Sequence, residues 1–165
     1  MSANRDSETT RTGHPADKLE QALVAAFRES ALPGENTGFD KKACEEAARY
    51  TLLCAQERQG SEASLLLESV SISQNHRHLR LAIVNDDMPF LVDSVCATIG
   101  GFGLTIERLI HPVVAVRRDA KGQLVEIAEQ ATSGEKCESI IYIELERTDA
   151  RVRRELVKAL RSNLK

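Results

Sequence analysis

The chain has 165 residues, which is enough for one full domain with an appended element or for two very small domains. It has 22 lysines and arginines against 25 aspartates and glutamates, and the resulting net charge of −3 gives no electrostatic reason to expect a nucleic-acid partner. Hydrophobic residues make up 42% and charged residues 28%, which is typical of a globular protein. Aromatic residues make up only 4%, so a base-stacking surface is not expected.

The sequence carries no targeting or membrane signal. No apolar run approaches the roughly 18 residues that a membrane helix needs, and the polar N-terminal segment lacks the apolar centre of a signal peptide. The four cysteines are far apart and form neither a C-x-x-C motif nor a Cys/His cluster, so we expect reduced thiols and no metal site. These features predict a cytoplasmic protein.

The N-terminal third of the chain has helical periodicity. Residues 1–14 are polar and predict a disordered lead-in. Residues 15–31 place apolar side chains on one face of a helix, and these are Leu19, Ala22, Leu23, Ala26 and Phe27. Asp40 is a candidate N-cap for a second helix over residues 41–59, whose small side chains suit close packing against the first. We interpret residues 15–60 as an appended helical hairpin.

The periodicity changes to that of strands after Gly60. Residues 69–73 and 79–83 alternate strictly and predict two strands joined by a hairpin connection. A helix follows, with Pro89 in its first turn and glycines 100, 101 and 103 at its end. Its apolar face consists of Leu91, Val92, Val95, Cys96 and Ile99.

Three further strands and a helix are expected after these glycines. A long strand over residues 104–117 and a returning strand over residues 123–128 flank a turn at residues 119–122. Pro112 cannot donate to a ladder, so it indicates a bulge or an edge within the long strand. Residues 141–146 alternate and predict a half-buried strand, and Val152, Leu156 and Leu160 place an amphipathic helix at the C-terminus.

The order of elements predicts the fold class. From Leu79 onward the chain has the strand–helix–strand–strand–helix order of a split βαβ unit, a ferredoxin-like arrangement with its last strand missing. We predict that residues 65–73 fill the missing position, antiparallel to the first strand, because an uncovered long edge invites aggregation. The expected fold is α+β, with an antiparallel sheet over residues 64–165 that carries two helices on one face.

The segment between the first strand of this unit and its helix is the most unusual in the sequence. Asn85, Asp86 and Asp87 place acceptor groups at a strand-to-helix turn, where backbone N–H groups and the helix dipole are also available. One interpretation is a small-molecule site at which these residues take an amino group or a cation, with Asp93 within reach one turn later. The other interpretation is that Asp86 and Asp87 cap the helix.

The remaining polar residues are interpreted as structural. His76 and His78 have no metal-ligating partner at a recognisable spacing, so a solvated hairpin is expected, and His111 is expected to be a hydrogen-bonded structural residue. The C-terminal helix is basic and is interpreted as a solvated surface, with a docking face as the alternative; its cations are Arg147, Arg151, Arg154, Lys158 and Arg161. The chain has no dinucleotide-binding, P-loop, serine-hydrolase or zinc-protease motif, so we expect no catalytic residue and no cofactor site.

Three stretches resemble a known family. These are NDDMPFLVDS at residues 85–94, GLTIERLIHPVVAVRRDAKGQL at residues 103–124 and ESIIYIELERTD at residues 138–149. The acidic turn, the amphipathic helix and the Gly-Leu-x-Ile re-entry into the sheet resemble the ACT domain. The full set is similar to the N-terminal ACT-like region of the large bacterial NAD-specific glutamate dehydrogenases, and this similarity is dense over residues 79–149.

The resemblance implies a part of a much longer enzyme that converts L-glutamate and NAD to 2-oxoglutarate, ammonia and NADH. The family's catalytic and NAD-binding residues lie outside this segment, so it implies an inert fragment that associates with the rest of the parent chain and its homo-oligomer. ACT domains generally bind amino acids or mediate subunit contacts. Phe90 replaces the glycine of the amino-acid-binding members, and its side chain is expected to fill the ligand space, which favours a scaffold role.

Two alternatives remain open at this point. In the first alternative, the chain is a free-standing amino-acid-binding ACT module that regulates another enzyme in trans. In the second, it is a pure dimerisation module that pairs through a sheet edge or through the helical hairpin. A site for an amino-acid effector would use Asn85, Asp86, Asp87, Phe90 and Asp93.

Overall fold

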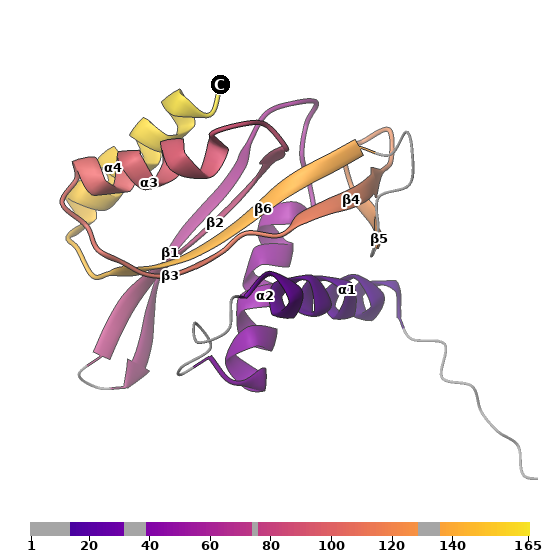
Figure 1. Ribbon diagram of the computed structural model, residues 1–165, viewed down its shortest axis with the longest axis horizontal. Helices are drawn as coiled ribbons and strands as arrows, with labels where there is room; N and C mark the ends of the chain where they lie inside the picture. The colour runs from indigo at the N-terminus through magenta and orange to yellow at the C-terminus, as the bar shows by residue number, and fades with distance from the viewer. Residues whose placement is uncertain (1–13, 32–38, 74–75, 129–135) are drawn as a thin grey trace, which may run out of the picture.

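The computed structural model describes residues 14–31, 39–73, 76–128 and 136–165. The expected disordered lead-in lies outside these ranges apart from His14, and so does the loop expected at Ser133 and Gly134. The described part is an α+β fold in which a six-stranded antiparallel sheet carries a pair of helices on each face (Figure 1). The predicted fold class is confirmed.

The sheet has the topology of a split βαβ unit with additions at both edges. Its strands are β1 (Ser64–Ser73), β2 (His76–Asp86), β3 (Ile106–Ile110), β4 (Val113–Arg118), β5 (Leu124–Ala128) and β6 (Lys136–Glu146). The order is β1-β2-β6-β4-β5, β3 pairs with β6, and every pairing is antiparallel. Strand β6 therefore lies between β2 and the β3–β4 segment, as a split βαβ unit requires.

Strand β1 occupies the position that the missing strand would have taken. It pairs antiparallel with β2, with Leu67 opposite Leu81, and forms one edge of the sheet. The prediction that residues 65–73 fill this edge is confirmed. Strand β5 forms the other edge and is an addition to the split βαβ unit.

The long strand expected over residues 104–117 is divided in two. Strand β3 ends at Ile110 and β4 begins at Val113, so the expectation of one continuous strand is wrong. Pro112 has no N–H to donate to the ladder, while its carbonyl oxygen accepts from the backbone N–H of Ile140 at 3.0 Å. The bulge or edge predicted at Pro112 is thus a complete break between β3 and β4. As a result, His111 lies outside both strands.

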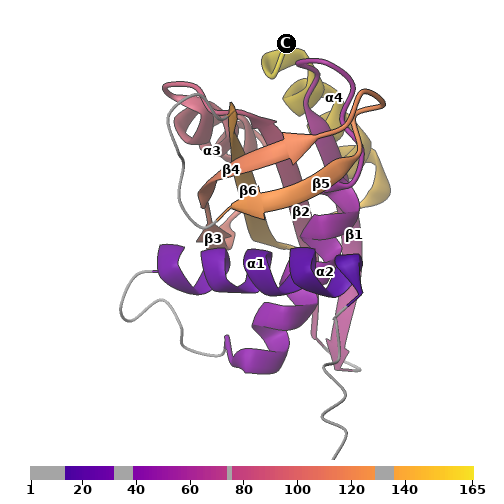
Figure 2. The same ribbon diagram turned by 90° about the vertical axis from the view of Figure 1, so that its right-hand side faces the viewer.

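Both helices of the split βαβ unit cover one face of the sheet. They are α3 (Leu91–Gly101) and α4 (Ala150–Asn163), and Figures 1 and 2 show them side by side on that face. Alternate residues of β2 and β6, such as Leu81 and Ile143, pack against Ile99 and Leu156 in one core cluster. The predicted apolar stripe of α3 and the predicted C-terminal helix are confirmed.

The opposite face is covered by α1 (Pro15–Ser30) and α2 (Lys41–Ala55), and α1 lies across α2 (Figure 2). The side chain of Asp40 accepts from the backbone N–H of Ala43 at 2.8 Å, so the predicted N-cap of α2 is confirmed. Helix α2 ends before the expected Gln59. It stops because the following residues turn toward the β4–β5 hairpin, where Leu124 N–H donates to the carbonyl of Gln56 at 2.9 Å.

The second helical layer changes the burial of the central strands. Tyr142 is only 3% exposed, and its ring centroid lies 5.9 Å from that of Phe27 on α1. Strand β6 is therefore buried on both faces along most of its length, and its predicted half-burial is wrong for this part. The alternation of residues 141–146 identified the face under α3 and α4 but not the partner of the other face.

Gly122, in the turn between β4 and β5, packs directly against the linker between α2 and β1. It has φ +82°, and a Cβ at this position would overlap the carbonyl oxygen of Arg58. The backbone N–H of Arg58 donates to the carbonyl of Gly122 at 3.0 Å, which holds the two segments together. Glycine is needed here both for the backbone conformation and for the space.

We expect Gly122→Ala to lower the free energy of unfolding by at least about 2 kcal/mol, because the positive φ and the overlap add. Gly100→Ala is the matched control, since a Cβ on Gly100 meets nothing within 4 Å and the residue is helical. That variant should raise the free energy of unfolding by roughly 0.5–1 kcal/mol. Urea denaturation measures both, and equal effects would contradict the close packing of the hairpin on the linker.

Candidate functional site at the β2–α3 turn

The predicted acidic turn leaves the sheet at the end of β2 and enters α3 through an unusual N-cap. Phe90 is the N-cap residue, with φ 64°, and it makes no side-chain capping hydrogen bond. The backbone N–H of Asp87 donates to the carbonyl of Cys137 at 3.2 Å, and the Asp87 carboxylate accepts from Ser139 Oγ at 2.9 Å. These bonds fix the start of the turn to β6. Asp93 lies exposed on the first turn of α3.

Neither aspartate at the end of β2 caps the helix. Oδ1 of Asp86 lies 3.0 Å from Nη1 of Arg58 and 3.0 Å from Nζ of Lys136. The interpretation of Asp86 and Asp87 as helix caps is therefore wrong. The Asp86 carboxylate does take cations, as the alternative interpretation expects of a ligand, but both cations belong to the same chain.

A buried ion cluster lies directly beneath this turn. The side chain of Arg58 is only 1% exposed and that of Glu138 is 0% exposed, and Arg58 Nη1 lies 2.9 Å from Glu138 Oε1. Arg118 binds the same carboxylate with two nitrogens, Nε at 2.7 Å and Nη2 at 3.0 Å, in a bidentate pair. Arg58, Arg118, Asp86 and Glu138 thus connect the α2–β1 linker with β2, β4 and β6.

This cluster lowers the pKa of Asp86. Burial raises the pKa of Asp86, but the hydrogen bonds from Lys136 and Arg58 outweigh it, so the pKa of Asp86 is lowered overall. The carboxylate is therefore charged at neutral pH and already has two cationic partners. A ligand's amino group would have to displace Arg58 or Lys136 to reach it.

A cleft of about 530 Å³ opens beside the cluster, between the α2–β1 linker and the β4–β5 hairpin. Its described lining includes four cationic side chains, Arg58, Arg117, Arg118 and Lys136. Each of them is paired with a carboxylate, namely that of Asp86, Glu138 or Glu126. The cleft therefore offers no unpaired positive charge from these residues to an anionic ligand.

Three side-chain atoms around the turn are buried without a hydrogen-bond partner among the described residues: Nδ2 of Asn85, Nη2 of Arg58 and Nε2 of His111. Burial lowers the pKa of His111, and the charge of Asp87 opposes this shift only in part. His111 is therefore neutral at physiological pH. The expectation that it is a satisfied structural residue is wrong for its Nε2 atom.

Phe90 presents its ring to solvent. The residue is 79% exposed, and Met88 in the same turn is 48% exposed. An L-residue at positive φ costs about 1–2 kcal/mol relative to the ordinary helical region. Because the Phe90 ring is exposed, its packing within the described chain offsets little of this cost. The turn thus combines backbone strain with an exposed apolar surface, a combination that occurs at contact sites.

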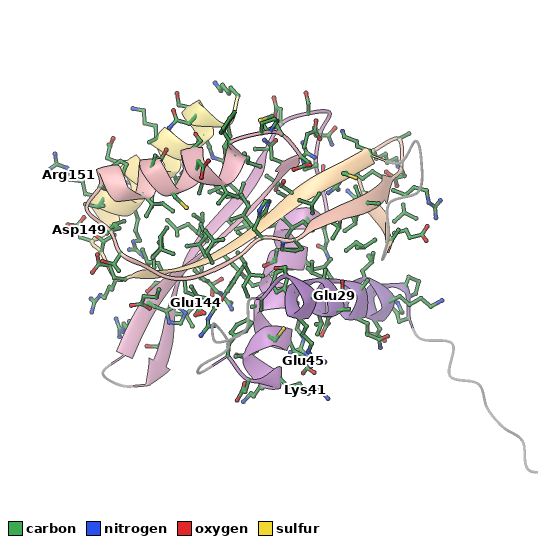
Figure 3. The ribbon with its side chains drawn as sticks, in the orientation of Figure 1. Glu29, Lys41, Glu45, Glu144, Asp149 and Arg151 are labelled. Atoms are coloured by element: carbon green, nitrogen blue, oxygen red, sulfur yellow. The ribbon has the colours of Figure 1, made fainter. Side chains whose placement is uncertain are left out.

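The other candidate residues have structural surroundings. His78 is buried, not solvated as expected, and its Nε2 lies 3.3 Å from Oε2 of Glu144, which also lies 2.7 Å from Arg108 Nε through its other oxygen. The side chain of His76 lies outside the described part. Figure 3 shows Asp149 and Arg151 at the start of α4, where Asp149 is the N-cap and Arg151 is exposed. Within the described ranges, no three His, Cys, Asp or Glu residues are placed to hold a metal ion.

Reasoning from the sequence did not single out Arg58, Arg118 or Glu138. A signal for two of them is present, since Arg118 and Glu138 each interrupt or border an apolar strand segment, where a charge requires a buried partner. Arg58 carries no such signal because it lies in a polar linker.

The sheet topology and the family match below define the chain as an ACT-like domain. The family model described as "Glutamate dehydrogenase, ACT1 domain" matches residues 24–160, and the chain belongs to this family. Two curated relatives, the NAD-specific glutamate dehydrogenases of Pseudomonas aeruginosa and Halomonas elongata, are each 39% identical over 72 residues. The match covers 42% of this chain and 4% of each relative, so the chain spans a small fraction of their length.

A comparison with solved structures finds none that matches the chain. Among the residues that the structure describes, none of the helices has the length and apolar character needed to cross a membrane.

The lowered pKa of His111 predicts a specific pH dependence. The unfolded chain takes up a proton near pH 6.5, above the folded-state pKa, so acidification favours unfolding. In His111→Gln this contribution is absent. As the pH falls from about 7.5 to about 5, the free energy of unfolding of the wild type should therefore decrease relative to that of the variant. Urea denaturation at a series of pH values measures it, and a constant difference would contradict the burial of a neutral His111.

Proposed function

We propose that this chain is the N-terminal ACT-like domain of a cytoplasmic NAD-specific glutamate dehydrogenase and that it serves assembly of that enzyme, not catalysis. In the parent, L-glutamate and NAD would be converted to 2-oxoglutarate, ammonia and NADH by residues elsewhere in the chain. The family match and the two curated relatives support the parent assignment. In this proposal, NAD binds elsewhere in the parent enzyme and not to this domain.

The observation that carries the assembly role is the geometry of Phe90. Its ring is exposed at a strained N-cap, beside the exposed Met88, on the turn that one interpretation of the sequence assigns to an effector site. The acceptors of that turn are engaged internally, Asp86 by Arg58 and Lys136 and Asp87 by Ser139. A surface on which Asp86 and Asp87 have internal partners and an aromatic ring is exposed suits a protein contact better than an amino-acid ligand.

An effector site formed by Asn85, Asp86, Asp87, Phe90 and Asp93 is the competing proposal. The buried Nδ2 of Asn85, which has no partner among the described residues, is the observation in its favour. A free-standing module acting in trans would use the same residues. The length of the native open reading frame distinguishes a free-standing module from a domain of the dehydrogenase. A reading frame that continues for many hundreds of residues beyond Lys165 supports the dehydrogenase.

A pure dimerisation module is supported by a different feature, the outer edge of β1. This strand has ten residues, and Glu68 is the only charged one among them. Nη2 of Arg80 lies 3.2 Å from Oε1 of Glu68, so the charge of Glu68 is already paired. It therefore opposes the pairing of this edge with another strand only weakly. A second copy could extend the sheet here by antiparallel pairing of β1 with its counterpart.

Light scattering across protein concentration, together with calorimetric titration of glutamate and aspartate, tests the assembly role. We expect reversible self-association and no saturable heat at millimolar amino acid. Phe90→Gly removes the ring and relieves the backbone, so it should weaken association at least about tenfold, with a change of at most about 1 kcal/mol in the free energy of unfolding.

The matched control is Leu53→Ala, which removes an exposed apolar side chain from α2 and should leave association unchanged. A strictly monomeric wild type would contradict an assembly role through this chain alone. Saturable binding of an amino acid that Asn85→Ala abolishes would instead support the effector site. Association that persists in Phe90→Gly but is lost in Ser69→Pro would assign the contact to the β1 edge.

A further inference from the structure

The exposed face of α4 carries a straight row of positive charge, which we call the α4 strip. Its members are Arg151, Arg154, Lys158 and Arg161, and successive members are three, four and three positions apart. All four are exposed. At about 1.5 Å and about 100° per residue, they extend over about 15 Å of the helix axis and lie within about 80° of one another around it. Figure 3 shows the first of them, Arg151, at the outer surface of the molecule.

The opposite face of the helix holds this strip in place. Leu156 and Leu160 are completely buried in the core beneath α4, and Asp149 is the N-cap of the helix. Near the other end, Nδ2 of Asn163 donates to Oγ1 of Thr98 on α3 at 2.8 Å. Because α4 is fixed at both ends and along its apolar face, the cations are presented on a preformed scaffold.

The charges of the strip are not neutralised within the described part of the chain. None of its four members forms an ion pair with a described carboxylate, and Glu155 is the only acidic residue of α4. Like charges three or four residues apart destabilise a helix. The helix dipole favours Arg161 in the last turn but opposes Arg151 in the first. The energetics of the helix alone therefore disfavour this row, whereas the carboxylates of a partner would offset its repulsion.

The distribution of charge favours a compact acidic partner over a large polyanion. Five cations and one glutamate give α4 a formal charge of +4, and because the whole chain carries −3, the remainder carries −7. A nucleic acid or an anionic bilayer extends far beyond one helix and would meet this negative remainder. Helix α4 also has no aromatic residue for base stacking, and none of the exposed large apolar side chains in the described ranges lies on it. A single acidic helix would contact the strip alone.

The spacing of the strip indicates that the partner is helical. The cations recur about every 5 Å along the axis, which is also the distance between carboxylates that recur every three or four residues on one face of another helix. An extended strand places its same-face side chains about 7 Å apart and falls out of step within the strip. No described helix of the chain has more than two carboxylates in such a row, so a second copy does not supply this partner.

We propose that the α4 strip binds an acidic helix from outside this chain, whose carboxylates lie opposite the four cations at the same spacing. Exposed ion pairs are individually weak and are screened by salt, so binding arises from the complete row and decreases at high ionic strength. The inference goes beyond the proposed assembly role. It concerns a different element from the Phe90 turn and holds whether or not Phe90 mediates a contact.

Fluorescence anisotropy at low ionic strength tests the proposal with a labelled, alanine-rich peptide whose glutamates repeat at the spacing of the strip. The control peptide has the same composition, with its glutamates distributed around the helix. We expect the matched peptide to bind the 165-residue chain at least about tenfold more tightly than the control peptide. It should also gain helical circular dichroism on binding, because repulsion between its glutamates leaves the free peptide only partly helical. Equal affinities, no saturable binding, or binding without a gain in helicity would overturn the proposal.

The double substitution Arg154→Gln and Lys158→Gln removes the centre of the strip and should weaken binding of the matched peptide at least about tenfold. Both side chains are exposed, and their removal relieves repulsion between like charges, so the melting temperature of the variant should not decrease. The matched control is Lys41→Gln with Lys42→Gln, which removes the same charge from exposed positions on α2 and should change the affinity by less than about twofold. A loss in the control as large as in the α4 variant would overturn the proposal. Tighter binding of a DNA oligonucleotide or of phosphatidylserine vesicles than of the matched peptide would overturn it as well.

Discussion

The buried pairing of Arg58 with Glu138 is the interaction on which the arrangement of this domain depends. A carboxylate with no exposure at the start of β6 requires positive partners, and it has two, Arg58 and Arg118. Arg58 comes from the linker that follows α2, so its guanidinium attaches the helical layer to the sheet. Removing Arg58 breaks a buried ion pair and leaves Arg118 as the remaining cationic partner of Glu138 among the described residues, and breaking a buried pair typically costs about 3–5 kcal/mol. The position of α2 over β2 and β6 is thereby linked to a charge that the sheet must neutralise.

The same cluster shapes the function of the neighbouring turn. Because Arg58 also reaches Asp86, the last residue of β2 is committed to an internal partner before α3 begins. The turn then continues through a strained and exposed Phe90. A turn of this construction presents an apolar contact surface and has few free acceptors, and this contrast underlies the proposed assembly role. Helices α1 and α2 add a second helical layer on the opposite face of the sheet.

Much of the fold was predictable from the sequence because its signals are local. Capping chemistry predicts Asp40 as the N-cap of α2, and residue spacing predicts the buried face of α3. Strand order predicts the position of β1 beside β2 at the edge of the sheet. The break at Pro112 was predictable as a disturbance but not as two separate strands. Tyr142 shows the limit of periodicity, since alternation identifies a buried face without revealing that a helical pair covers the other one.

The candidate site was less predictable because its partners are distant in the sequence. Arg58 and Glu138 are far apart along the chain, and only the sheet order brings β2, β4 and β6 together beneath one linker. The acidic turn was recognised as unusual, yet the cations that occupy it could not be named from spacing. Phe90 was recognised as a departure from the ACT pattern, but its ring points to solvent instead of into a ligand space.

The most direct test of this account compares the free energies of unfolding of Arg58→Met and Arg117→Met by urea denaturation. Arg117 is the matched control, because it pairs with Glu126 at 3.1 Å on the same hairpin but its side chain is 67% exposed. We predict a loss of about 3–5 kcal/mol for Arg58→Met and of less than about 1 kcal/mol for Arg117→Met. Equal losses in the two variants would contradict the claim that the buried cluster holds the helical layer on the sheet.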